Sequence, residues 1–196
     1  MLNIQRKPPP RMTVADFIDW PGDGTGRRFQ LVDGEVREIP IGSVLRGLIH
    51  TNINYLVASQ LKAADGPYCA LSRPSIVPRV RASLNLRAPA LGVAAAPDQP
   101  TQYVVPDPVL LIEILTPDNA TDVWDNVWSY CTIPSVQEIA VVHSTRVLAE
   151  LLRRGRDGHW PEEPEEIGSD GMLRFASIGL TCPLLDVYAQ TYLGPS

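Results

Sequence analysis

The feature that most constrains the fold is a run of large aliphatic residues at positions 109–115. It reads Val-Leu-Leu-Ile-Glu-Ile-Leu, so six of its seven side chains are large and aliphatic. A run this short and this apolar is typical of a strand covered on both faces. Pro117 ends it, and Asp118 and Asp122 favour a helix running to about Cys131, because acidic side chains stabilise a helix N-terminus. The segment therefore predicts a central strand in a layered α/β fold.

The segments around this strand predict the remaining elements. Residues 29–32 and 36–39 are short β patterns on either side of Asp33 and Gly34, which favour a tight hairpin because both tolerate positive φ. Apolar residues at helical spacing predict a long helix over about residues 45–61. Further strands are expected within 68–80, 90–96, 139–142, 147–152 and 172–175, with short helices at 13–18 and 184–192. This order predicts a mixed β-sheet flanked by helices, with an N-terminal β-hairpin, in a single domain over residues 12–192 that follows a flexible arm at 1–11.

Composition narrows the class of protein. Seventeen basic residues against 22 acidic ones give a net charge of −5, which is not the overall charge of a nucleic-acid-binding protein. The stretch between Asp65 and Asp98 nevertheless contains no acid, and is either a solvated face or a phosphate-binding surface. It carries Arg73, Arg79, Arg81 and Arg87. Three scattered cysteines, no signal peptide and no long apolar run predict a cytoplasmic protein that does not cross a membrane.

Lysine is rare in this chain. Only Lys7 and Lys62 are lysines among the 17 basic residues. Codon usage in a GC-rich genome explains the scarcity, but it has a chemical consequence: a mechanism that requires a lysine has only two candidates. Lys7 lies in the proline-rich arm, and Lys62 lies at the far end of the long predicted helix.

Glu113 is the one acidic residue within the aliphatic run. A buried carboxylate without partners costs several kcal/mol. Three interpretations are open: an ion pair with an arginine, a raised pKa that leaves the group neutral, or a role as ligand to a cation.

Other polar residues are candidates to join Glu113 in a site. His50 lies near the apolar stripe of the long helix, where it is either a core histidine or a site residue. Asn126 and Tyr130 are one turn apart on the next helix and therefore share a face. Gln30 and Glu35 flank the hairpin turn, where Glu35 is either an exposed turn residue or a site residue.

Five motifs in this order carry a resemblance to a known family. They are Phe-Gln-Leu-Val-Asp-Gly-Glu at 29–35, the helix with His50 and Ile53, Ala-Pro-Ala-Leu-Gly-Val at 88–93, Leu-Ile-Glu-Ile-Leu-Thr-Pro at 111–117, and Asn126 to Tyr130 followed by Ile-Pro-Ser-Val-Gln-Glu-Ile at 133–139. Over residues 12–192 the chain resembles the Uma-two family of restriction endonucleases, a branch of the PD-(D/E)XK nuclease superfamily. The resemblance implies a restriction-endonuclease-like core, often a homodimer, that hydrolyses DNA phosphodiesters with Mg²⁺ or Mn²⁺.

The resemblance also implies roles for particular residues, and two positions depart from the family pattern. Glu113 matches the central metal-binding acid, and His50 matches the helix histidine if the preceding loop is longer. Ala90 stands where the family usually has its second metal-binding acid, and an alanine cannot ligate a metal. Asn126 stands where the helix often supplies a lysine. Glu35 is present in the hairpin.

Three hypotheses follow. In the first, the chain is a metal-dependent endonuclease with an eroded site, in which Glu113 is the principal ligand, Glu35 or His50 completes the site and Asn126 positions water. In the second, it is a non-catalytic binding or regulatory dimer that contacts nucleic acid through the four arginines of residues 73–87. In the third, a single natural or engineered change at Ala90 or at Gln30, where the family often has a glutamate, inactivates a working enzyme.

Overall fold

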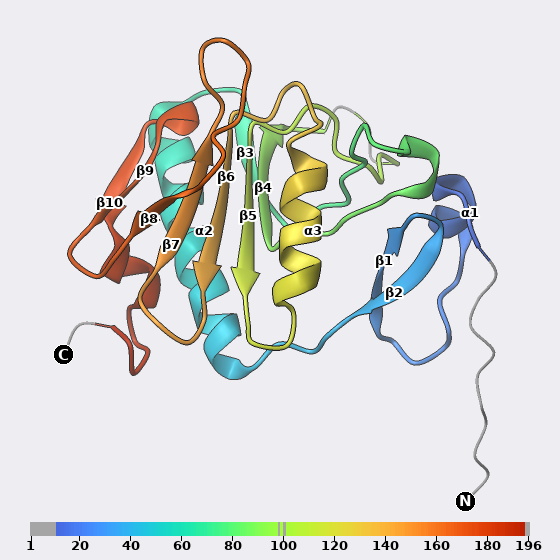
Figure 1. The fold of residues 1–196 in the computed structure, drawn as a ribbon, viewed down its shortest axis with the longest axis horizontal. Coiled ribbons are helices and arrows are strands. Elements are labelled where there is room, and N and C mark those ends of the chain that lie inside the picture. Colours follow the sequence, from blue (N-terminus) through green and yellow to red (C-terminus); the bar gives the residue numbers. More distant parts are fainter. Residues whose placement is uncertain (1–10, 98, 100, 195–196) are drawn as a thin grey trace, which may run out of the picture.

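The centre of the molecule is a six-stranded mixed β-sheet. The computed structural model describes residues 11–97, 99 and 101–194. The strand order is β3-β4-β5-β6-β7-β8, and β5 and β6 form the one parallel pair among these strands. The strands are β3 (Tyr68–Ser72), β4 (Leu91–Ala95), β5 (Leu110–Leu115), β6 (Glu138–His143), β7 (Ala149–Arg153) and β8 (Glu165–Ile167). The predicted mixed sheet, with the aliphatic run as an inner strand, is confirmed (Figure 1).

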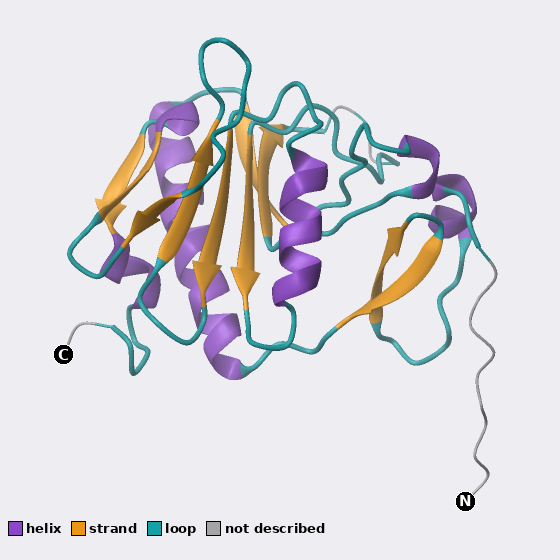
Figure 2. Ribbon diagram, in the orientation of Figure 1, coloured by secondary structure: helices purple, strands orange, loops and turns teal. Residues whose placement is uncertain are grey.

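Helices cover both faces of this sheet, as the continuous apolar pattern of β5 requires. The long helix α2 (Val44–Ala64) lies behind the sheet and α3 (Ala120–Tyr130) lies in front of it (Figures 1 and 2). Successive side chains of a strand point to opposite faces. Accordingly Ile112 joins the core cluster that contains Ile53 of α2, whereas Leu111 joins the cluster that contains Val127 of α3. Glu113 shares the alternation of Leu111 and therefore faces α3.

A separate hairpin precedes α2. Its strands are β1 (Arg28–Val32) and β2 (Glu35–Ile39). Asp33 and Gly34 have φ values of 50° and 82°, so the predicted tight turn is present. Main-chain hydrogen bonds between Leu31 and Leu86 tie the hairpin to the loop that leads into β4. The predicted short N-terminal helix is α1 (Val14–Asp19), which Thr13 caps because Thr13 and Asp16 form a reciprocal capping box.

The structure differs from the sequence predictions at four segments, one of which is the edge strand β8, where no strand was predicted. The strand expected within residues 68–80 ends at Ser72, because Arg73 has a φ of 49° and Pro74 follows. The closing helix expected at 184–192 is wrong: Leu184–Tyr188 is a short 3-10 turn, and Gln190 at φ 60° redirects the chain. The strand β10 (Leu180–Pro183) was not predicted, and it pairs with β9 (Met172–Phe175). The remaining short 3-10 turns are η1 (Ala82–Leu84) and η2 (Ala176–Ile178).

Two further expectations concern the terminus and the membrane. The arm predicted at 1–11 lies outside the described residues except for Arg11, which is exposed. Within the described part of the chain, none of the helices has the length and apolar character needed to cross a bilayer.

Candidate functional site

Glu113 lies at the centre of a buried polar cluster between β5 and α3. Its carboxylate Oε1 accepts hydrogen bonds from Asn126 Nδ2 at 3.1 Å and from the Tyr130 hydroxyl at 2.9 Å. The main-chain N–H of Ala90, directly before β4, also acts to lower the pKa of this carboxyl. Asn126 and Tyr130 thus share the helix face predicted from their spacing. Among the described residues, no arginine or lysine forms an ion pair with Glu113, so the first of the three interpretations does not apply.

Burial determines the ionisation of this cluster. It raises the pKa of Glu113 from its usual value of 4.5 to about 7, against the opposing effect of the bonds from Tyr130 and Asn126 and of the positive charge of Arg46. Burial also raises the pKa of Tyr130 well above its usual value, and the Glu113 charge acts in the same direction. Tyr130 is therefore a neutral donor, while Glu113 populates both protonation states near neutral pH.

His50 reaches the same region from α2. Its Nε2 lies 2.8 Å from the carbonyl oxygen of Ala90 and 3.3 Å from the Ser72 hydroxyl. Because a carbonyl can only accept, Nε2 carries the proton in this contact. The His50 imidazole therefore supports the main chain at Ala90 by binding its carbonyl oxygen.

The half-buried position of His50 leads to a testable prediction. Burial lowers its pKa, and the charges of Arg73 and Arg46 lower it further despite the favourable bond to Ala90. We expect nitrogen NMR to show a neutral ring protonated at Nε2 at pH 7. Arg73→Ser should raise the pKa of His50, whereas the control Arg79→Ser, which changes an exposed arginine, should leave it unchanged. A charged ring at pH 7 would contradict the assignment.

A small cavity of about 30 Å³ adjoins the cluster, and its lining includes Gln30, Glu113 and Asn126. Asn126 Nδ2 lies 3.4 Å from Gln30 Oε1, and Asn126 Oδ1 is buried without a partner. The volume of this small cavity suits about one water molecule. Gln30, on β1, thus joins the Glu113 cluster from the hairpin.

The residues present do not fit the two-acid metal centre that the resemblance implies. Glu113 is the one carboxylate of the polar cluster. The other two acids of the cavity lining, Glu38 and Asp122, form ion pairs with Arg27 and Arg37 respectively. The described residues contain no group of three or more His, Cys, Asp or Glu side chains that suits a metal ion. A hard dication such as Mg²⁺ prefers carboxylate oxygens in near-octahedral geometry, and Ala90 supplies none.

The structure does not bring Glu35 to this cluster. Glu35 lies at the exposed end of the hairpin, where its Oε1 is 3.8 Å from an Arg11 guanidinium nitrogen. The turn at Asp33 and Gly34 places Glu35 at the end of the hairpin, while Gln30 lies three residues before Asp33 and is buried. Of the four predicted site residues, Glu113, Asn126 and His50 therefore gather around Ala90 and Glu35 does not.

The prediction that four arginines form one phosphate-binding surface is wrong. The four are Arg73, Arg79, Arg81 and Arg87. Arg87 is only 5% exposed, and its guanidinium donates to Asn85 Oδ1. Arg81 is ion-paired with Asp33, and the main-chain N–H of Arg79 donates to Thr132. Only Arg73 lines a cleft. The irregular loop between β3 and β4, with its 3-10 turn, sends the four side chains to different environments.

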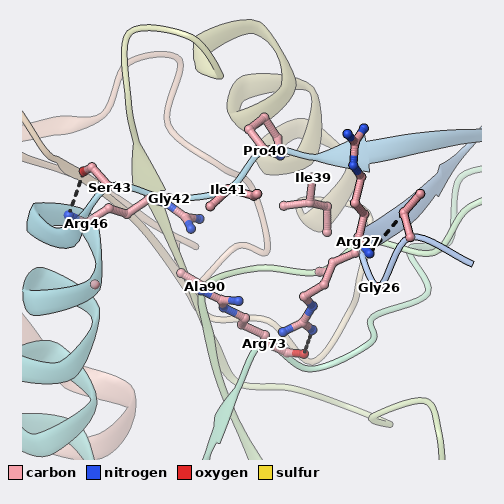
Figure 3. A pocket seen from close by; sticks show the side chains of 14 residues that line it. Gly26, Arg27, Ile39, Pro40, Ile41, Gly42, Ser43, Arg46, Arg73 and Ala90 are labelled. Carbon is pink, nitrogen blue, oxygen red and sulfur yellow. Dashed lines mark hydrogen bonds between the residues drawn. The ribbon is translucent and has the colours of Figure 1, made fainter. Parts of the chain in front are cut away.

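A different set of arginines does converge. A cleft of about 390 Å³ beside Ala90 is lined by Arg28 of β1, Arg46 in the first turn of α2 and Arg73 after β3, together with Arg27 (Figure 3). We call it the arginine cleft. Arg46, Ala88, Ile39 and Pro40 line both this cleft and the small cavity at Glu113, so the two are adjacent. The adjacent pair Arg27-Arg28 was the only local signal for it in the sequence.

Comparisons with known proteins agree with this fold. The Uma2 family model, whose description is "Putative restriction endonuclease", matches residues 14–183. The uncharacterized protein slr1290 of Synechocystis sp. is 23% identical over 157 residues, which cover 78% of this chain and 80% of that protein. The crystal structure of a putative nuclease from Anabaena variabilis superposes with a TM-score of 0.74 at 16% identity, covering 91% of this chain and 98% of that one. The nuclease-like α/β fold is thereby confirmed.

Proposed function

This chain belongs to the Uma2 family, and from that membership we propose that it is a nucleic-acid-binding protein on a restriction-endonuclease-like domain that lacks efficient phosphodiester hydrolysis. The single observation that carries the proposal is the adjacency of two features. The arginine cleft opens beside the Glu113 cluster, and that cluster holds one acid where metal-dependent hydrolysis uses two.

The binding part of the proposal is supported by local charge. The net charge of −5 belongs to the whole chain, whereas none of the described residues that line the arginine cleft is an aspartate or a glutamate. Guanidinium groups bind phosphate oxygens through paired N–H donors. A cleft of this kind can therefore bind a polyanion on a protein that is acidic overall.

The hydrolytic part is supported by the chemistry of two side chains. A metal-dependent nuclease uses its cation to stabilise charge on the phosphate and to activate water. Here Ala90 offers no oxygen from its side chain, and Asn126, which donates to Glu113 at 3.1 Å, carries no charge. The competing function is metal-dependent endonuclease activity with Mg²⁺ or Mn²⁺, which the oxygens of Gln30, Glu113 and Asn126 around the small cavity favour.

Binding and cleavage measured on the same preparation test the proposal. Fluorescence anisotropy with single- and double-stranded oligonucleotides should show binding that weakens about 20- to 40-fold between 50 and 200 mM salt, as expected for about three phosphate contacts. Plasmid and oligonucleotides incubated with Mg²⁺ or Mn²⁺ should remain intact. Absence of binding, or binding insensitive to salt, would overturn the proposal. Cleavage that disappears in Glu113→Ala would instead establish the endonuclease.

A further inference from the structure

We infer that the arginine cleft binds the terminal phosphate monoester of a nucleic-acid strand, together with its nucleoside, rather than an internal phosphodiester. This inference rests on the proposed function and deepens it, because it names the part of the nucleic acid that the cleft takes.

Three guanidinium groups in the cleft form no direct ion pair with the described part of the protein, although the charges of Glu113 and Asp118 act favourably on Arg46. Among the described residues, no acidic side chain forms an ion pair with Arg28, Arg46 or Arg73. Arg27 differs, since its Nη1 lies 2.7 Å from Glu38 Oε2. The three unpaired guanidinium groups come from β1, α2 and the turn after β3, so folding brings together like charges that are far apart in sequence.

This arrangement is electrostatically unfavourable without an anion. Burial lowers the pKa of Arg28 and of Arg46, and the nearby charge of Arg73 lowers both further. For Arg46 the charges of Glu113 and Asp118 oppose this effect but do not outweigh it. In addition, Arg46 Nε is buried and has no hydrogen-bond partner. An unsatisfied buried donor costs free energy that a bound acceptor recovers. The cleft is therefore built to receive negative charge.

The number of charges favours a terminal phosphate. A phosphate monoester carries a charge of about −1.5 to −2 near pH 7 and has three free oxygens. An internal phosphodiester carries a single negative charge and only two free oxygens. Ser43, Arg46 and Gly47 at the start of α2 line the cleft, and the N-terminal end of a helix adds partial positive charge. The positive charge of three guanidinium groups and this helix end therefore matches the negative charge of a dianion.

The size and the apolar side of the cleft favour a strand end. Its volume of about 390 Å³ is within the usual range for pockets that bind small organic molecules. A terminal nucleotide can enter such a space. An internal phosphate of a duplex has nucleotides on both sides, so the strand must lie across the opening of the cleft. Ile39, Pro40 and Ile41 form one side, and the Ile41 side chain is 90% exposed (Figure 3). An exposed aliphatic side chain beside arginines provides a contact for the face of a base.

Gly42 accounts for the position of Arg46. A Cβ atom at Gly42 would lie 3.0 Å from Arg46 Cδ and 3.1 Å from Nη1, which is closer than usual. The Arg46 side chain thus lies along the main chain at Gly42, and Figure 3 shows it extending from the helix past this residue. Gly42→Ala should displace the guanidinium without removing its charge.

The test compares strand ends with the full-length chain. Internally labelled single-stranded oligonucleotides of one sequence would carry a 5′-phosphate, a 3′-phosphate or hydroxyl groups at both ends. We expect one phosphorylated form to bind about tenfold or more tightly than the hydroxyl form. A deoxynucleoside monophosphate should compete, and its nucleoside should not. Arg46→Gln and Arg73→Gln should abolish the preference, Gly42→Ala should reduce it, and the matched control Arg79→Gln should keep it.

The outcomes separate the inference from the proposed function. Equal affinity for all three oligonucleotides would overturn the inference and leave nucleic-acid binding intact. Binding of none of them would overturn both. Direct binding of the monophosphate, measured by calorimetry, without any oligonucleotide binding would overturn the strand-end assignment and assign the cleft to free nucleotides. Retained preference in both Arg46→Gln and Arg73→Gln, with the variants folded by circular dichroism, would place the binding elsewhere.

Discussion

The double variant Ala90→Asp, Asn126→Lys is expected to cleave DNA in the presence of Mg²⁺ at least about 100-fold faster than the natural chain. The expectation follows from where the two positions lie. The main-chain N–H of Ala90 lies near enough to Glu113 to lower its pKa, and Asn126 Nδ2 lies 3.1 Å from Glu113 Oε1. The substitutions therefore introduce a second carboxylate and a positive charge next to the existing acid, which is the combination that the family resemblance implies for an active site.

The single variants provide the controls. Ala90→Asp alone places a second acid near a Glu113 that is only 4% exposed, so we expect lost stability and little activity. Asn126→Lys alone supplies a cation but no second ligand, and should remain inactive. Adding Glu113→Gln to the double variant should remove the gained cleavage. A folded, DNA-binding double variant that does not cleave would show that more than these two groups separates this chain from an active nuclease.

Glu113→Gln in the natural chain is expected to stabilise the protein at pH 8 by about 3 kcal/mol, with little effect at pH 4.5. Burial raises the pKa of Glu113 from 4.5 to about 7, so the folded state binds more protons than the unfolded state between these pH values. The free energy of unfolding of the natural chain should therefore fall as pH rises from 4.5 through 7, and remain reduced above that. Glutamine stays neutral and removes this contribution.

Urea unfolding across this pH range measures the effect. The difference in unfolding free energy between the natural chain and Glu113→Gln should grow as the pH rises and level off above about pH 8. Glu166→Gln, which neutralises an exposed acid on β8, is the matched control and should not reproduce this pH dependence. A natural chain more stable than Glu113→Gln at pH 8 would mean that the carboxylate is satisfied in its charged form.

The elements predicted correctly are those with strong local patterns. The aliphatic run became β5, the helical stripe became α2, and the turn at Asp33 and Gly34 formed with the expected positive φ angles. The predicted helix at 184–192 failed because its apolar residues are instead buried by a 3-10 turn. Leu184, Val187 and Tyr188 are all buried there, and the Tyr188 hydroxyl donates to the carbonyl of His143 on β6. That contact is 45 residues away in sequence, so no local pattern reports it.

The polar cluster around Glu113 was partly predictable, because some of its members follow from local sequence patterns. Asn126 and Tyr130 share a helix face by spacing, and the alternation along β5 turns Glu113 toward that helix. Gln30 and Glu35 lie on opposite sides of the hairpin turn. Which of the two faces the protein depends on how the hairpin packs against the rest of the chain, and no local pattern shows this. Glu35 ended exposed and Gln30 ended buried.

The mixed α/β architecture and the burial of Glu113 could be predicted from the sequence, because periodicity and residue identity act over short distances along the chain. Helical spacing also placed Asn126 and Tyr130 on one face as candidate partners of Glu113. The missing second acid at Ala90 came from the family resemblance. The burial of Arg87, and the meeting of Arg28, Arg46 and Arg73 in one cleft beside Glu113, required the folded structure. Each of these three arginines comes from a different element, so their convergence depends on how β1, α2 and the turn after β3 pack together.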